Sequence, residues 1–153
     1  MPIRVPCPGA KCNLPPFVLC PKAELRNLRG LYFSSAVDEA SAVNIATVIP
    51  RAESRLAKRF PSIESVLGTG TPIHECLVTV SDDQGKPYRF FVAFREQQNL
   101  PINPALKKLL PDGDFRGEVV VMRAGARVMV VDLRGAKLAL LAKRAVRASS
   151  SAR

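Results

Sequence analysis

Two residues of the chain could act together in catalysis, the cysteine Cys76 as a nucleophile and the single histidine, His74, as its general base. A thiol is activated when a base lies within hydrogen-bond reach, about 2.6 to 3.2 Å. Two positions apart on an extended strand, these side chains share a face but lie about 6.5 to 7 Å from each other. We therefore expect both to be core residues of a strand. An enzyme built on them is the third of three functional hypotheses.

Three further cysteines, Cys7, Cys12 and Cys20, lie in the first 20 residues. Thiolates hold structural zinc in sets of four, so Cys76 or His74 would have to supply the fourth ligand. The spacing is unlike a common zinc knuckle, because four residues separate the first two cysteines and no second close pair follows. We expect unligated cysteines and no cofactor. The alternative is a structural zinc ion bound by Cys7, Cys12, Cys20 and Cys76.

The sequence patterns of common catalytic and nucleotide sites are missing. The chain has no Gly-Lys-Ser/Thr phosphate loop, no Gly-x-Ser-x-Gly elbow, no Gly-x-Gly-x-x-Gly and no His-Glu-x-x-His. The acidic runs Asp82-Asp83 and Asp112-Gly113-Asp114 are typical of turns, where carboxylates bond to their own backbone. A binding protein is therefore favoured over an enzyme.

Charge gives the strongest functional signal. The formal net charge is +10, and residues 115–153 carry nine lysines and arginines against two acids. Residues 136–147 have an amphipathic pattern that gathers cations on one side. Such cations form either a solvated helix face or a surface that contacts phosphates. The candidate contacts for nucleic acid or another polyanion are Lys137, Lys143, Arg144, Arg147, Arg123, Arg127 and Arg134.

The leading hypothesis is a non-enzymatic binding protein that contacts nucleic acid or an acidic protein surface through these cations. The alternative is a protein-interaction or self-associating module, a homo-oligomer among the possibilities, whose contact is Leu77, Phe91 or an unpaired sheet edge. No apolar run approaches the roughly 20 residues that span a bilayer, and the first 20 residues lack the apolar stretch of a signal peptide. We expect an intracellular protein, nuclear or cytoplasmic, without membrane insertion.

A β-hairpin is predicted around the turn Asp83-Gln84-Gly85, because Gly85 can take a positive φ at no steric cost. The register that follows fixes which side chains share a face. On the expected core face, Val80 lies opposite Tyr88, Val78 opposite Phe90, Cys76 opposite Val92 and His74 opposite Phe94. On the other face, Thr79 lies opposite Arg89, Leu77 opposite Phe91 and Glu75 opposite Ala93.

Helices are predicted over residues 22–28, 36–49, 51–60, 62–67, 104–110 and 136–147. The helix over 36–49 rests on Ser35 and Asp38, which are spaced like a capping box, and on Pro50 as its stop. Residues 117–133 predict a second hairpin with its turn at 123–126.

We therefore expect an α+β fold with a four-stranded antiparallel sheet, made from two β-hairpins that are each followed by a helix (ββα-ββα). A helical segment and an extended Pro/Cys-rich arm precede this sheet. The expected domain organisation is an arm over residues 1–21, a single domain over 22–148 and a flexible basic tail over 149–153.

Overall fold

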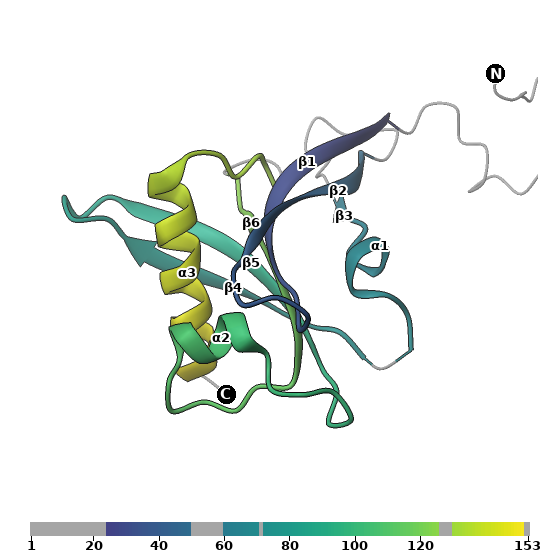
Figure 1. The fold of residues 1–153 in the computed structure, drawn as a ribbon. Helices are drawn as coiled ribbons and strands as arrows, with labels where there is room; N and C mark the ends of the chain where they lie inside the picture. Colours follow the sequence, from purple (N-terminus) through teal and green to yellow (C-terminus); the bar gives the residue numbers. More distant parts are fainter. Residues whose placement is uncertain (1–23, 50–59, 71, 126–129, 152–153) are drawn as a thin grey trace, which may run out of the picture.

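A computed structural model describes residues 24–49, 60–70, 72–125 and 130–151 (Figure 1). One antiparallel sheet runs through them in the order β3-β2-β1-β6-β5-β4. The strands are β1 (Glu24–Phe33), β2 (Ser41–Ile49), β3 (Phe60–Pro61), β4 (His74–Ser81), β5 (Pro87–Glu96) and β6 (Gly117–Arg123). The helices are α1 (Glu64–Leu67), α2 (Pro104–Leu109) and α3 (Ala136–Ser151). In Figure 1, α2 and α3 lie on one side of the sheet and α1 lies near β2 and β3.

The predicted four-stranded ββα-ββα arrangement is wrong. The sheet has five strands of seven to ten residues and a sixth, β3, of two residues. The extra strands are β1 and β2, which form a hairpin where helices were predicted over 22–28 and 36–49. The fold is therefore mostly sheet, with helices that cover its two faces.

The β-branched residues of β2 explain why this segment is a strand. Val43, Ile45 and Thr47 alternate along the chain, so a strand places them on one face of the sheet. Ile45 and Thr47 are completely buried there, and the Thr47 hydroxyl donates to the carbonyl oxygen of Arg26 (2.9 Å). Ser35, which resembled a helix cap in the sequence, donates its hydroxyl proton to Glu118 instead (3.3 Å).

The second hairpin, predicted over residues 117–133, is replaced by pairing of β6 with β1 and β5. Strand β6 lies inside the sheet, and its two edges are taken by β1 and β5. Of its predicted partner, Val131 makes a single bridge to Arg123, while residues 126–129 lie outside the described residues. The chain then passes β1, where the N–H of Leu133 donates to the carbonyl oxygen of Arg29 (2.9 Å).

The β4–β5 hairpin has the register that the sequence predicted. All seven predicted pairs, from His74 opposite Phe94 to Val80 opposite Tyr88, are present. Gly85 has a φ of 83°, and the N–H of Asp82 donates to the carbonyl oxygen of Lys86 (2.9 Å). The turn residue therefore has the positive φ that the prediction required.

Both faces of β5 are buried, so the sheet supports two hydrophobic clusters. Phe90 and Val92 pack under α2 and α3, whereas Phe91 and Ala93 belong to a cluster with Ile63 and Leu67 near α1. The edge strand β4 is less completely buried than β5. Leu77 remains 56% exposed, and His74, expected in the core, is exposed with its ring stacked on Phe94 at 5.4 Å.

The helices predicted over 62–67, 104–110 and 136–147 are present as α1, α2 and α3, and α3 continues to Ser151. The helix predicted over 51–60 lies outside the described residues except for Phe60, which begins β3. A buried side chain, Asn103, caps α2 by accepting hydrogen bonds from the N–H groups of Ala105 and Leu106. None of the helices in the described residues is long and apolar enough to span a membrane.

Candidate polyanion-binding surface

Three cationic side chains surround the ring of Tyr88. The Nζ atoms of Lys86 and Lys137 lie 5.4 and 5.3 Å from its centroid, and the guanidinium carbon of Arg123 lies 5.7 Å away. The strand alternation places Lys86 and Tyr88 on the same face of the hairpin, and Arg123 lies opposite the neighbouring Phe90 on that face. Lys137 comes from the first turn of α3. We call Asp82, Lys86, Tyr88, Arg123 and Lys137 the Tyr88 cluster.

Asp82 is the carboxylate of this cluster. Its Oδ2 lies 2.9 Å from Nζ of Lys137, and its Oδ1 accepts hydrogen bonds from the N–H groups of Gln84 and Lys86, both at 2.9 Å. The hydrogen bond from Lys137, followed by the bond from the Lys86 backbone, lowers the pKa of Asp82 to about 2. The same contact raises the pKa of Lys137. With three cations and one carboxylate, the cluster carries a positive excess at neutral pH.

The outward face of α3 extends this positive surface. Lys137, Leu140, Arg144 and Arg147 follow one another at spacings of three or four residues, so they lie on one side of the helix. All four are exposed, and Leu140 is 62% exposed. The opposite side faces the sheet through the buried residues Leu141, Ala142, Ala145 and Val146. The amphipathic pattern of the sequence is thus realised, with cations on the solvent side.

A shallow groove of about 260 Å³ joins this helix face to the hairpin turn. Its lining residues are Asp82, Asp83, Gln84, Lys137, Leu140, Leu141 and Arg144. We define the cationic surface as the Tyr88 cluster together with Arg144 and Arg147. Lys143, which the sequence also predicted as a contact, lines a separate groove with Asp38, Glu39 and Lys108.

The cations of this surface differ in how they are already engaged. Lys137 is paired with Asp82, and Arg147 donates to the carbonyl oxygen of Leu109 (3.2 Å). Among the described residues, Arg144 has neither a carboxylate partner nor a hydrogen bond. The guanidinium and ammonium groups that are least compensated are therefore near the middle of α3 and around Tyr88.

The remaining predicted contacts lie elsewhere or outside the described residues. Arg134 pairs with Asp132 (3.0 Å), whose pKa is lowered mainly by the N–H of Arg29. Arg127 falls in the segment that the structure does not describe.

The residues of the hypothetical zinc site are not brought together in the described part of the chain. Cys7, Cys12 and Cys20 lie outside it. Cys76 is half-buried on β4, and burial raises the pKa of its thiol. The described residues contain no group of three or more His, Cys, Asp or Glu side chains arranged to hold a metal ion.

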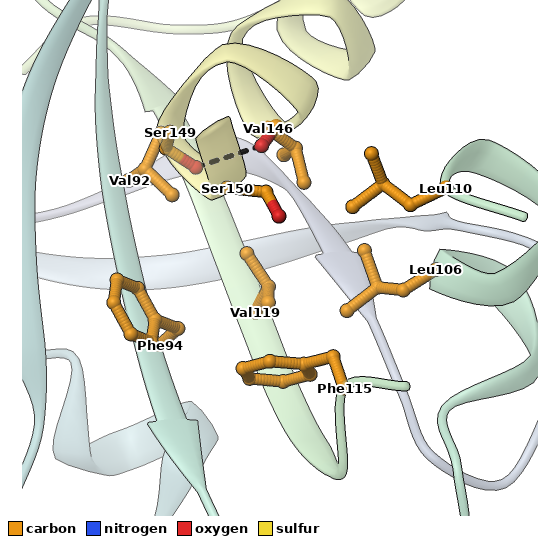
Figure 2. Close-up of a pocket in the computed structure, with 9 residues that line it drawn as sticks. All are labelled: Val92, Phe94, Leu106, Leu110, Phe115, Val119, Val146, Ser149 and Ser150. Atoms are coloured by element: carbon orange, nitrogen blue, oxygen red, sulfur yellow. Dashed lines mark hydrogen bonds between the residues drawn. The ribbon is translucent and has the colours of Figure 1, made fainter. Parts of the chain in front are cut away.

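An apolar pocket lies between α2, α3 and the sheet (Figure 2). Figure 2 shows the side chains of Val92, Phe94, Leu106, Leu110, Phe115, Val119, Val146, Ser149 and Ser150 around it. Its volume is about 20 Å³, and the Ser149 hydroxyl donates to the carbonyl oxygen of Val146 (2.8 Å). A space of this size holds about one water molecule, whereas small-molecule sites are roughly 300 Å³ or larger.

Sequence reasoning identified Arg123 and Lys137 as candidate contacts but missed that they meet at one tyrosine. Tyr88 was placed on the expected core face of the hairpin, and Lys86 was not among the candidate contacts. The signal that could have found them is the alternation of Lys86 and Tyr88 on one strand face, next to a helix that begins with a cation.

No protein family, no curated protein and no solved structure matches this chain. Its function is therefore inferred from the side chains themselves.

Proposed function

We propose that this protein is a non-enzymatic binding protein that contacts nucleic acid or another polyanion through the cationic surface. The observation that carries this proposal is the gathering of Lys86, Arg123 and Lys137 around Tyr88 with one carboxylate to balance them. Closely spaced cations attract phosphates, and binding is favoured because the counterions of the polyanion are released.

The dimensions of α3 suit a phosphate backbone. Lys137 and Arg147 are ten residues apart, which corresponds to about 15 Å along a helix. That length equals roughly four steps of 3.4 Å along one strand of duplex DNA. Several phosphates can therefore lie along the helix at once, with Arg144 between its two ends.

The proposal favours contact with phosphates over contact with bases. An exposed row of aromatic rings would be needed to stack several bases. Here Phe90 is completely buried, and the Tyr88 ring is surrounded by its three cations. Since phosphate contacts carry no sequence information, we expect little preference for base sequence.

Paired charge-removal variants test this proposal. The first variant, Lys86→Gln with Arg144→Gln, removes two cations from the cationic surface. The control, Lys107→Gln with Lys108→Gln, removes two exposed cations from α2, where each pairs with an aspartate. Binding of each protein to fluorescein-labelled duplex DNA is followed by anisotropy at low salt.

We expect the first variant to bind at least tenfold more weakly than wild type and the control to bind within about twofold of it. Equal weakening in the two variants would mean that net charge alone determines binding. Absence of binding by the wild-type protein at low salt would overturn the proposal itself.

A further inference from the structure

Among the described residues, no strand pairs with the outer edge of β4, and this free edge of the sheet is a second candidate surface. β4 is the last strand in the sheet order and is paired on one side, by β5. Its eight residues include no proline, and Leu77 at its centre is 56% exposed. An edge of this length offers unpaired backbone groups to another strand, and proteins commonly protect such edges with prolines, charges or bulges.

The hairpin turn determines which backbone groups of β4 are free. The N–H of Asp82 donates to the carbonyl oxygen of Lys86, so this pair is hydrogen-bonded. Hydrogen-bonded and non-hydrogen-bonded pairs alternate along an antiparallel ladder. Alternate residues from Asp82 back to His74 therefore bond to β5. The N–H and C=O groups of Glu75, Leu77, Thr79 and Ser81 point away from the sheet. The partner of Ser81 is Pro87, which has no N–H to donate. This agrees with the pattern, because Ser81 and Pro87 form a pair that is not hydrogen-bonded.

We propose that β4 pairs with β4 of a second copy of this chain, antiparallel and centred on Leu77. This register places Leu77 opposite Leu77 of the other copy and Glu75 opposite Thr79, so each free residue meets a free residue. The two Leu77 side chains cover each other on the face opposite α3. The pairing is two-fold symmetric and closes as a dimer.

Charge complementarity selects this register over its neighbour. Within each copy, Thr79 is paired with Arg89, and all these side chains share one face. Glu75 of one copy therefore lies in one row with Thr79 and Arg89 of the other copy. The backbones of Glu75 and Arg89 are then about two strand spacings, or roughly 10 Å, apart. Glutamate and arginine side chains can meet over the short threonine.

The charges themselves fit this pairing. Among the described residues Glu75 has no ion pair. Arg89 uses one Nη2 bond to the Gly125 carbonyl oxygen and has further donors. If the register were centred on Val78 instead, Glu75 would face Ser81 and Pro87, with no cation in that row.

Sedimentation of the full chain from about 5 to about 500 µM tests the dimer, a range suited to a small interface. We expect wild type to pass reversibly from monomer to dimer. Thr79→Pro removes an outward N–H without breaking a bond to β5, so it should remain monomeric with an unchanged circular dichroism spectrum. Thr79→Val keeps that N–H and is the matched control, which should dimerise as wild type does.

A wild-type protein that stays monomeric, or a Thr79→Pro variant that dimerises equally well, would overturn the proposal. Assembly beyond the dimer would also overturn it, because the symmetric pairing leaves no second β4 edge.

Amide hydrogen exchange of the wild-type protein provides a second measurement that does not depend on a variant folding. The amides of Leu77 and Thr79 should exchange quickly in dilute protein and slowly at high concentration. The amides of Cys76 and Val78, which bond to β5, should be protected at both concentrations. Exchange of Leu77 and Thr79 that does not change with concentration would contradict the dimer.

Discussion

The Nζ atom of Lys137 lies 2.9 Å from Oδ2 of Asp82, so an ion pair joins the first turn of α3 to the turn of the β4–β5 hairpin. Asp82 is at once the residue that closes the turn and the counter-ion of a cation proposed to contact phosphates. A polyanion that reaches Lys137 must therefore compete with a carboxylate of the protein itself.

Removing the charge of Asp82 should strengthen polyanion binding. Asp82→Asn retains a side-chain oxygen that accepts from the turn N–H groups, but it no longer neutralises Lys137. We expect tighter binding to duplex DNA and a salt dependence that steepens by about 0.9 in log affinity against log salt, for one more phosphate contact. Anisotropy titrations at several salt concentrations measure both.

The matched control is Asp83→Asn, which makes the same change of net charge at the neighbouring exposed residue. It should raise affinity slightly and leave the slope unchanged. If the two variants behave alike, Asp82 acts only through the net charge of the protein.

The same ion pair should make stability depend on pH in the acid range. The pKa of Asp82 is about 2 in the folded protein, below the value of about 3.9 for an unfolded aspartate. Its contribution to stability is therefore complete above about pH 5 and is lost progressively as the pH falls through about 2. Denaturant melts of wild type and Asp82→Asn should converge between about pH 5 and pH 2. A stability difference that stays constant over this range would contradict the assignment.

Gly85 should tolerate substitution poorly although space surrounds it. Its φ is 83°, and apart from Gly85 itself and its two neighbours in the chain, no atom lies within 4 Å of where a Cβ would stand. The cost of Gly85→Val is then conformational, and we expect a loss of more than about 1 kcal/mol in the free energy of unfolding. Gln84→Ala, one residue earlier, should be nearly neutral. Denaturant melts showing equal, small losses would mean that the turn does not need this backbone conformation.

Asn103 should be among the most sensitive polar residues of the fold. Its side chain is completely buried, donates to the carbonyl oxygens of Phe33 and Gly117, and accepts two N–H groups at the start of α2. Asn103→Ala loses the helix cap and leaves buried carbonyls without donors, so we expect a loss of about 2 to 4 kcal/mol. Asn44→Ala, at an exposed position on β2, is the control and should change stability by less than about 0.5 kcal/mol in thermal or denaturant melts. Similar losses in both variants would contradict the special role of Asn103.

The sequence predicts best where one residue determines the local geometry. Gly85 fixes the turn, and strand alternation then gives every pair of the β4–β5 hairpin. The β1–β2 hairpin was not predictable in this way, because Ser35, Asp38 and Pro50 imitate the start and stop signals of a helix. The alternation of Val43, Ile45 and Thr47 was the competing signal, and the burial of that face determined the outcome.

The long-range arrangement could not be predicted from local patterns. Nothing near β6 in the sequence indicates that β1 pairs with β6 at the edge where the predicted hairpin partner of β6 would have paired. The same limit explains the Tyr88 cluster, whose cations come from β6, from α3 and from the residue beside the hairpin turn. The sequence predicted an excess of positive charge, and tertiary structure decided which cations are neighbours.

The salt dependence of wild-type binding to duplex DNA tests the proposed function most directly. Three cations of the cationic surface, Lys86, Arg123 and Arg144, have no carboxylate partner among the described residues. If each contacts one phosphate, log affinity should fall against log salt with a slope of about −2.7, and duplexes of different sequence should give the same slope. A slope near zero, or no binding at the lowest salt concentration, would contradict the proposal that this surface binds polyanions.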